Sequence, residues 1–303
     1  MTERIQVWVL LLLSQFTFTQ IKGVVVDENN KPISYVNIWI ENENSGTTSE
    51  QDGSFTLDIK NQDKNLIFSA IGYKKALTPF KEKIVLEKEV YQLDEVLVSS
   101  LKQTQELEIG YYESNGFRYS MGYFIDAIYF KPLLDEREKY PFLKEIKFKT
   151  KSKNKNAKVR IYLVEVNKDG SPSENLLSEE LFLEVKKGNS KNVIDLSKFK
   201  ISIPENGFFI VFEKLKIEQN KHFEEYYFKD KNGKKKFSSG LSYQPEIPLV
   251  PIDEQIGWNK RINNKWEKSE KTTIQNPNSF ENFLMKKYHN KYLVPSVNIT
   301  LTN

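Results

Sequence analysis

Short runs of alternating apolar and polar residues, separated by turn formers, constrain the fold of this chain most strongly. The segment YVNIWI at residues 35–40 shows the pattern, because Val36, Ile38 and Ile40 occupy every second position. A period of two places these three side chains on one face of a pleated strand. The same pattern recurs throughout residues 21–90, so this region is predicted to consist of β-strands rather than helices.

Turn-forming residues mark where these strands end. Pro32 in ENNKP fixes φ and removes a backbone donor, so it predicts a turn. Asp52-Gly53, inside TTSEQDGSFTLDI, supplies the positive φ of a tight hairpin. About seven strands fit into some 70 residues, which favours a small antiparallel sandwich over residues 21–90.

The remainder of the chain repeats the strand pattern on a larger scale. From Leu107 the segments FLKEIKFKT, KVRIYLVEV, ELFLEV, NVIDLSKFKISIP and GFFIVFEKL have strand length, and NKDGSP, KKGN and PENG separate them. Their order resembles a jelly-roll sandwich, so residues 107–303 are predicted to be a second, jelly-roll-like β domain. Residues 91–106 are the predicted linker, and one short helix is predicted at residues 280–288.

Composition supports an all-β fold and excludes several function classes. Aromatic residues make up 13% of the chain, and such residues suit half-buried sheet surfaces. The net charge is only +4 and the charges are interspersed, so a nucleic-acid partner is not expected. The densest basic run, residues 229–236, is interpreted as a solvated hairpin tip. The absence of cysteine excludes disulfides, thiolate zinc sites, a cysteine nucleophile and a lipidated cysteine.

The N-terminus has the pattern of an export signal. Arg4 precedes an apolar core from Val7 to Leu13, which is too short to span a bilayer as a helix. We therefore expect residues 1–20 to be a signal peptide cleaved near Gln20, with the mature chain in the periplasm, at the cell surface or secreted. A buried first strand is the alternative interpretation.

Residues 21–100 carry a set of motifs that points to a family. The set comprises GVVVD, PISYVNI, GTTSEQDGSF, FSAIGY and QLDEVLVSS. It resembles the carboxypeptidase-regulatory-like domain that is common in exported Bacteroidetes proteins. The resemblance implies a transthyretin-like, generally non-catalytic sandwich.

In many relatives the segment equivalent to LDEVLV leads into the plug and barrel of a TonB-dependent outer-membrane receptor. Here 203 of the 303 residues follow Ser100, too few for a large barrel, and the strands carry Lys and Glu on both faces. We therefore expect no such barrel. Residues 91–106 are interpreted either as a linker or as a docking strand for a partner sheet.

The sequence offers little for catalysis or metal binding. The only histidines are His222 and His289; Glu224 shares a strand face with His222, but two ligands do not make a metal site. The acidic pairs at residues 135–136 and 253–254 are neighbours in polar loops, which solvation explains. We predict no catalytic, cofactor-binding or metal-ligating residues.

Aromatic residues of the final third are the candidate ligand contacts. Trp258, Trp266, Tyr243 and Tyr292 lie in a loop-rich region, and the two tryptophans flank a predicted turn at Asn263-Asn264. They either cross-pair as a buried aromatic pair or form an exposed platform for a glycan or a partner strand.

These observations predict an exported, non-catalytic envelope protein that serves as a binding or adhesion module for glycan or protein. The alternatives are a structural accessory protein that docks to an outer-membrane or secretion assembly, and an enzyme acting on polysaccharide or peptide. Exposed paired tryptophans favour the first, a bare edge or large apolar patch favours the second, and facing carboxylates favour the third.

Overall fold

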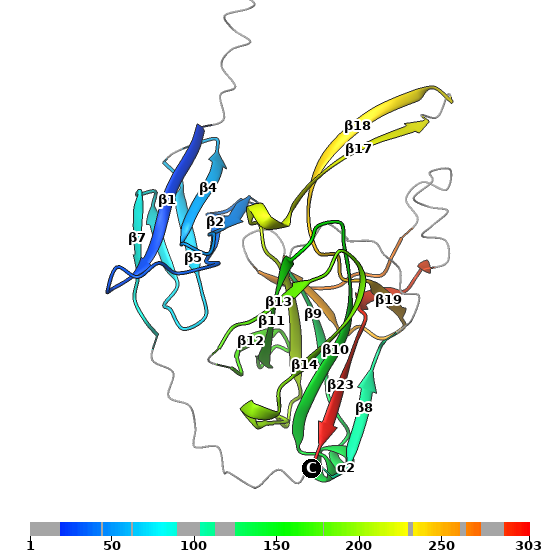
Figure 1. The fold of residues 1–303 in the computed structure, drawn as a ribbon. Helices are drawn as coiled ribbons and strands as arrows, with labels where there is room; N and C mark the ends of the chain where they lie inside the picture. Colours follow the sequence, from blue (N-terminus) through cyan, green and yellow to red (C-terminus); the bar gives the residue numbers. More distant parts are fainter. Residues whose placement is uncertain are drawn as a thin grey trace, which may run out of the picture. The chain divides into compact units, whose positions relative to one another are not determined.

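The computed structural model describes residues 19–43, 45–61, 63–89, 104–112, 125–177, 179–229, 233–260, 265–273 and 288–303. The predicted signal peptide up to residue 18, the QLDEVLVSS segment, the predicted turn at 263–264 and the predicted helix up to residue 287 lie outside these ranges. The chain divides into two compact units, residues 1–89 and 90–303. Each unit is built from sheets (Figure 1), so the all-β prediction is confirmed.

Unit 1 has two sheets. Its described strands are β1 (Thr19–Asp27), β2 (Asn37–Ile40), β3 (Gly46–Thr48), β4 (Ser54–Ile59), β5 (Asn65–Ser69), β6 (Ala76–Pro79) and β7 (Lys83–Leu86). One sheet has the order β4-β1-β7 and the other the order β3-β2-β5-β6. Phe55 from the first sheet meets Phe68 from the second edge-on, with ring centroids 5.9 Å apart, so the core lies between the sheets.

Two details of unit 1 differ from the sequence prediction. The β1–β7 pair is parallel, while the other pairs of this unit are antiparallel. The Asp52-Gly53 turn forms, with Gly53 at φ 76°, but the strands on its two sides belong to different sheets. The turn therefore links the two layers instead of closing a hairpin.

Side-chain hydrogen bonds from two buried residues hold the turns of unit 1. Asp27 is buried, and its carboxylate accepts the backbone N–H groups of Asn29 and Lys31, both at 2.9 Å. Buried Ser49 accepts from the Val36 N–H at 2.8 Å and donates to the Ile33 carbonyl at 3.1 Å. Both side chains thus satisfy backbone groups that the sheets leave unpaired.

Unit 2 contains a longer series of strands. They are β8 (Glu106–Gly110), β9 (Ile125–Phe130), β10 (Phe142–Ser152), β11 (Ala157–Val166), β12 (Pro172–Asn175), β13 (Leu181–Val185), β14 (Gly188–Asp195), β15 (Ile201–Ser202), β16 (Phe208–Lys214), β17 (Lys221–Lys229), β18 (Lys235–Tyr243), β19 (Leu249–Ile252), β20 (Gly257–Lys260), β21 (Trp266–Lys268), β22 (Tyr292–Pro295) and β23 (Val297–Thr302). The short helix α2 (Leu134–Lys139) precedes β10, and the 3-10 turns η1 (Ser197–Phe199) and η2 (Glu218–Asn220) follow β14 and β16.

Eight of these strands have jelly-roll connectivity. In chain order they are β8, β9, β10, β11, β13, β14, β16 and β23. The smaller sheet has the order β8-β23-β10-β14, and the larger sheet contains β9-β16-β11-β13. Numbered one to eight, the sheets read 1-8-3-6 and 2-7-4-5, with every pairing antiparallel. This order matches the two interlocked Greek keys of a jelly roll, as the sequence pattern predicts.

The main core of unit 2 fills the space between these sheets. Phe148 on β10 packs against Phe212 on β16 with ring centroids 5.0 Å apart, and residues from both sheets surround them. The insertion between the seventh and eighth strands, residues 215–296, contributes β17 to β22. Two of its strands, β20 and β21, extend the larger sheet beside β9.

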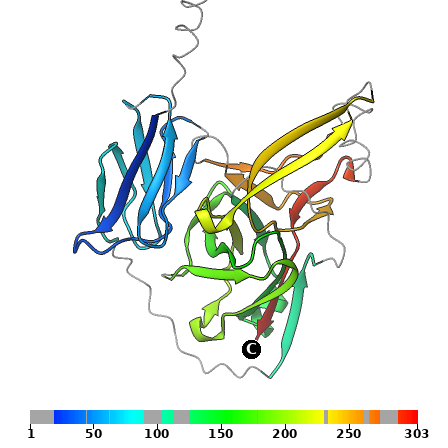
Figure 2. The ribbon, with the colours of Figure 1, turned by 45° about the horizontal axis from the view of Figure 1, so that its top comes forward.

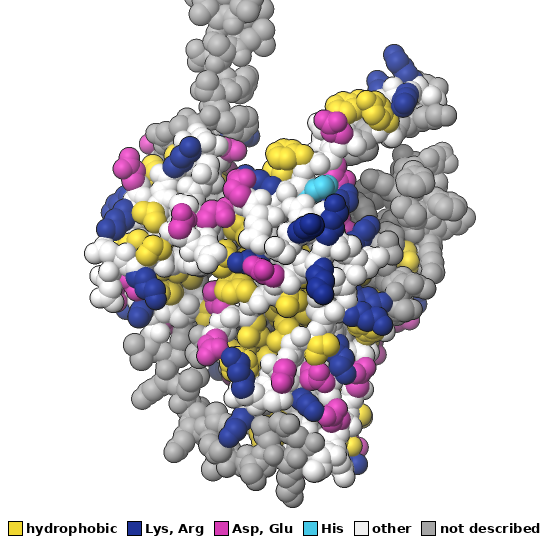
Figure 3. All heavy atoms as spheres, in the orientation of Figure 1, with side chains coloured by type: hydrophobic (Ala, Val, Ile, Leu, Met, Phe, Trp, Pro, Cys, Tyr) yellow, Lys and Arg dark blue, Asp and Glu magenta, His cyan; other side chains and the backbone are white. Residues whose placement is uncertain are grey.

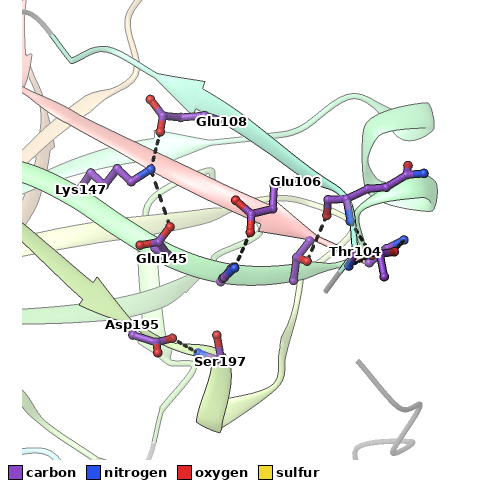
Figure 4. Close-up of polar contacts among 11 residues, drawn as sticks. Thr104, Glu106, Glu108, Glu145, Lys147, Asp195 and Ser197 are labelled. Atoms are coloured by element: carbon purple, nitrogen blue, oxygen red, sulfur yellow. Dashed lines mark hydrogen bonds and ion pairs between the residues drawn. The ribbon is translucent and has the colours of Figure 1, made fainter. Parts of the chain in front are cut away.

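Ion pairs and amides tie the first strand of the jelly roll to the strands beside it (Figure 4). The Lys147 ammonium reaches Glu108 at 2.6 Å and Glu145 at 3.7 Å. The Asn298 amide donates to Glu108 at 2.8 Å. Lys144 forms an ion pair with Glu106. These contacts hold β8 at the edge of the smaller sheet, close to the C-terminus.

Candidate functional site

A two-stranded arm, formed by β17 and β18, is the most distinctive surface feature of unit 2. Nine residue pairs join the strands, from Lys221 opposite Tyr243 to Lys229 opposite Lys235. In the part of the chain that the structure describes, neither strand pairs with any other. Both ribbon views show the arm projecting beyond the sheets of the sandwich (Figures 1 and 2). It confirms the predicted hairpin around the basic run, whose tip lies outside the described residues.

One face of this arm is apolar and open. Alternate pairs share a face of a ribbon, so Phe223 opposite Leu241 and Tyr227 opposite Phe237 lie on the same side. Their exposed fractions are 75%, 46%, 66% and 53%, in that order. The Tyr227 and Phe237 rings are 5.4 Å apart. We call these four residues the arm face. Figure 3 shows apolar side chains along the arm and basic side chains toward its free end.

The opposite face of the arm is attached to the sandwich at its base. His222 Nδ1 lies 3.0 Å from Asn154 Oδ1, and the Asn154 amide donates to the Lys221 carbonyl at 2.7 Å. Glu224 forms an ion pair with Lys153. His222 and Glu224 are therefore engaged with the β10–β11 turn. These contacts fix one face of the arm to the sandwich and leave the arm face turned away from it.

A buried asparagine anchors the start of the arm. Asn220, in η2, is fully buried; its side-chain oxygen accepts the Lys158 N–H at 2.7 Å. Its amide donates to the carbonyl of Lys158 at 2.7 Å and to that of Leu215 at 3.0 Å. The side chain thus acts like an extra strand residue against β11.

Basic side chains gather near the free end of the arm. Lys234, Lys235 and Lys236 are exposed, and the Lys235 ammonium lies 4.6 Å from the centre of the Tyr227 ring. In sequence, residues 229–236 carry five lysines against one aspartate. The arm therefore combines an aromatic face with a concentrated positive charge.

A second aromatic cluster lies on the outer face of the larger sheet, away from the main core. Buried Trp258 packs edge-on against Phe209 with ring centroids 6.2 Å apart, and Trp266 packs against the same cluster. Trp258 stands opposite Lys268, and Trp266 opposite Lys260, so the tryptophans are diagonal neighbours. The two rings therefore share one face of the β20–β21 pair without standing directly opposite each other.

The four predicted ligand contacts belong to three different sheets. Each Trp ring has a lysine of the other strand above it: Lys268 at 5.6 Å from Trp258 and Lys260 at 5.1 Å from Trp266. Tyr243 ends the arm strand β18, at its base. Tyr292 pairs with Ile252 in the β19–β22 sheet. Only the tryptophans come together, and a ligand-binding role for the four residues remains a prediction.

Charged groups buried in unit 2 form two clusters. Arg160 contacts Glu213 at 3.3 Å and Glu180 at 3.7 Å, with its guanidinium 5.3 Å from the Phe182 ring centre. Burial, with Glu213 nearby, raises the pKa of Tyr162 well above its usual range. The phenol next to this cluster is therefore neutral at physiological pH.

The second cluster surrounds Asp126 on β9. Burial raises the pKa of Asp126 to about 6, and the Lys214 ammonium opposes the rise. With its amide oriented to satisfy both neighbours, Asn259 donates to the Asp126 carboxylate at 2.9 Å and accepts from Ser269 Oγ at 3.1 Å. Burial also lowers the pKa of Lys216 to about 8.

The carboxylate pairs considered for catalysis contain three side chains with structural partners, Glu136, Asp253 and Glu254. Glu136 accepts the Leu133 N–H at 2.8 Å at the start of α2. Asp253 pairs with Lys291 at 2.5 Å, and Glu254 accepts from the Tyr111 hydroxyl at 3.4 Å. Among the described residues, no group of three or more His, Asp or Glu side chains has the arrangement of a metal site.

Sequence reasoning missed the arm face. Residues 221–229, KHFEEYYFK, contain Phe223 and Tyr227, four positions apart. Residues 235–243, KKFSSGLSY, contain Phe237 and Leu241 at the same spacing. Either strand alone looks like a charged surface ladder. Only the register between β17 and β18 brings the four apolar side chains onto one face.

Comparisons with known proteins give one family match and one similar protein. The family model described as CarboxypepD_reg-like domain matches residues 21–98. A TonB-dependent receptor of Formosa agariphila is 26% identical over 110 residues, which are 33% of this chain and 11% of the receptor. The chain therefore spans about a tenth of the length of that relative. Within the described ranges, no helix combines the length and apolar character needed to cross a membrane.

The match covers the strands of the two-sheet unit, including Asp27, the Asp52-Gly53 turn and the buried Ser49. Residues 21–98 of this chain are therefore a CarboxypepD_reg-like domain, followed in the same chain by a jelly-roll sandwich.

Proposed function

We propose that this chain is an exported, non-catalytic protein of the bacterial cell envelope that docks to another envelope component through the arm face. Residues 21–98 match a domain of a generally non-catalytic type, and a third of the chain is similar to part of a TonB-dependent receptor. Export is supported by the signal-like residues 1–20.

The observation that carries this proposal is the exposure of the four arm-face side chains. Large aromatic residues contribute about 150 to 250 Å² each when buried, so an open face of this kind favours a contact surface. An isolated two-stranded hairpin is only marginally stable in water. A partner that covers the arm face would bury these apolar side chains and stabilise the hairpin.

Envelope co-sedimentation tests this function. Envelope fragments from cells that express the chain are washed and incubated with purified full-length protein. We expect the wild type to sediment with the fragments and a Phe223→Ser, Tyr227→Ser, Phe237→Ser variant to stay in the supernatant. Equal sedimentation of both proteins would remove the arm from the proposed function.

Glycan binding is the second candidate, and Trp266 is the observation that favours it. Its side chain is only partly buried, and it lies beside Trp258 at the edge of the larger sheet. A glycan array of the wild type and a Trp258→Ala, Trp266→Ala variant tests this candidate. Specific binding that the folded double variant loses would support a sugar site there, with Tyr243 and Tyr292 as more distant candidates.

A further inference from the structure

We propose that the component bound by the arm is an anionic lipid bilayer, which the arm contacts in its interfacial layer. The inference rests on the proposed docking role and gives it a partner. The arm face would lie against the acyl-chain boundary, and the lysines near the free end would lie among the lipid phosphates.

The order of residue pairs along this face supports a lipid surface. From base to free end the pairs are Lys221–Tyr243, Phe223–Leu241, Glu225–Ser239, Tyr227–Phe237 and Lys229–Lys235. Apolar and aromatic pairs thus lie between lysine-containing pairs. Aromatic side chains favour the headgroup level of a membrane, and lysine stems extend to reach phosphates from apolar surroundings.

The positive charge favours lipid over a protein partner. Lysine is depleted in protein–protein interfaces, whereas juxtaposed lysines strengthen binding to anionic lipid roughly fivefold each. Lys235 is exposed on the same face as Phe237, one same-face pair further toward the free end, so charge and apolar area lie on one surface. Lys234 and Lys236 are exposed beside it in the chain, with Lys236 on the opposite face.

The backbone limits how deeply the arm can enter. In the described chain, β17 and β18 pair only with each other, so the outer edge of each strand keeps backbone groups that require water. The arm therefore lies along the interface, where apolar side chains enter by about 5 to 10 Å.

Glu225 opposes this binding and supplies a test. It is exposed on the same face, between the two apolar pairs, where anionic headgroups repel its carboxylate. Glu225→Lys should therefore strengthen lipid binding. For a protein partner that pairs a basic group with Glu225, the same change should weaken binding.

Vesicle co-sedimentation of the full-length protein tests the inference. The vesicles contain phosphatidylethanolamine and phosphatidylglycerol, or phosphatidylcholine alone as the uncharged comparison. We expect binding to the anionic vesicles, weakened about tenfold or more in the Phe223→Ser, Tyr227→Ser, Phe237→Ser variant. A Lys234→Gln, Lys235→Gln, Lys236→Gln variant should bind on the order of a hundredfold more weakly, and Glu225→Lys about fivefold more tightly.

Circular dichroism and the melting midpoint show whether each variant is folded. Absence of wild-type binding to anionic vesicles, or equal binding by all variants, would overturn the lipid inference. If the wild type sediments with envelope fragments through the arm but ignores protein-free vesicles, docking stands and the partner is a protein or glycan. If the wild type sediments neither with envelope fragments nor with anionic vesicles, the docking role is overturned as well.

Discussion

Arg160 shows how a single residue can control the stability of unit 2. Its side chain is 2% exposed and lies between Glu213 and Glu180. Removing one partner of a buried ion pair leaves an uncompensated charge in a low dielectric. We expect Arg160→Met to lower the free energy of unfolding by about 3 to 5 kcal/mol, measured by urea denaturation.

The matched control is an exposed ion pair. Lys198 and Glu179 are 3.5 Å apart, and their side chains are 69% and 63% exposed. Lys198→Met should cost less than about 1 kcal/mol. If Arg160→Met and Lys198→Met lower the free energy of unfolding by similar amounts, burial does not determine how much an ion pair contributes.

Asp126 makes the stability depend on pH. Its pKa is about 6 in the folded chain against 3.8 for the free side chain, because burial disfavours the charged form. Between these values the folded chain binds more protons than the unfolded chain. The contribution of Asp126 to the free energy of unfolding therefore falls as the pH rises from about 4 to about 6. The total change is about 2 to 3 kcal/mol.

Asp126→Asn should remove this dependence of stability on pH. Urea unfolding of both proteins at several pH values would show the wild type losing stability relative to the variant across this window. Asp58→Asn, which alters an exposed carboxylate on β4, is the control. A constant difference between wild type and Asp126→Asn would contradict a raised pKa for Asp126.

At the scale of the element, the arm depends on its base. Asn220 makes three hydrogen bonds to backbone groups of β11 and of the segment after β16. Leaving buried backbone groups unpaired costs about 1 to 3 kcal/mol each. Asn220→Ala should lower the unfolding free energy by at least about 2 kcal/mol. It should also raise hydrogen exchange in β17 and β18.

The control for that substitution is Asn189, an exposed residue on β14. Asn189→Ala should leave both stability and exchange in the arm close to the wild-type values. Unchanged exchange in the arm after Asn220→Ala would show that the arm does not depend on this anchor.

The individual strands could be predicted from alternation and turn residues, and the jelly-roll-like fold of the larger domain from the resemblance of its segment order. The pairing of distant strands was harder to predict. The Asp52-Gly53 turn has the local chemistry of a hairpin, yet β3 before it pairs with β2 while β4 after it pairs with β1. Tertiary packing decided which sheet each side joined, and no local pattern encodes that choice.

The candidate site was predictable only in part. The tryptophans of β20 and β21 share a face as expected, but they are offset by two residues along the strands, so each stands opposite a lysine. The arm face depends on the same kind of information. Phe223 and Leu241 are 18 positions apart, and only the register across the turn makes them neighbours.

At the scale of the molecule, the two units have separate cores. Phe68 belongs to the core of unit 1 and Phe148 to that of unit 2, and both are fully buried. Each Phe→Ala change should cost about 3 to 5 kcal/mol within its own unit. Hydrogen exchange followed by mass spectrometry should show Phe68→Ala loosening β2 and β5 only. Phe148→Ala should loosen β10 and β16 only, and equal effects across both units would contradict independent cores.

The most direct test of the docking claim uses the absence of cysteine from the chain. A single thiol at Ser239→Cys lies on the arm face between the two apolar pairs, and one at Val193→Cys, 55% exposed, lies on β14. Maleimide labelling is measured in purified protein and in envelope fragments. We predict that both thiols react in solution and that only the Ser239→Cys thiol is protected in the fragments. Equal labelling of Ser239→Cys in solution and in fragments would contradict docking through the arm.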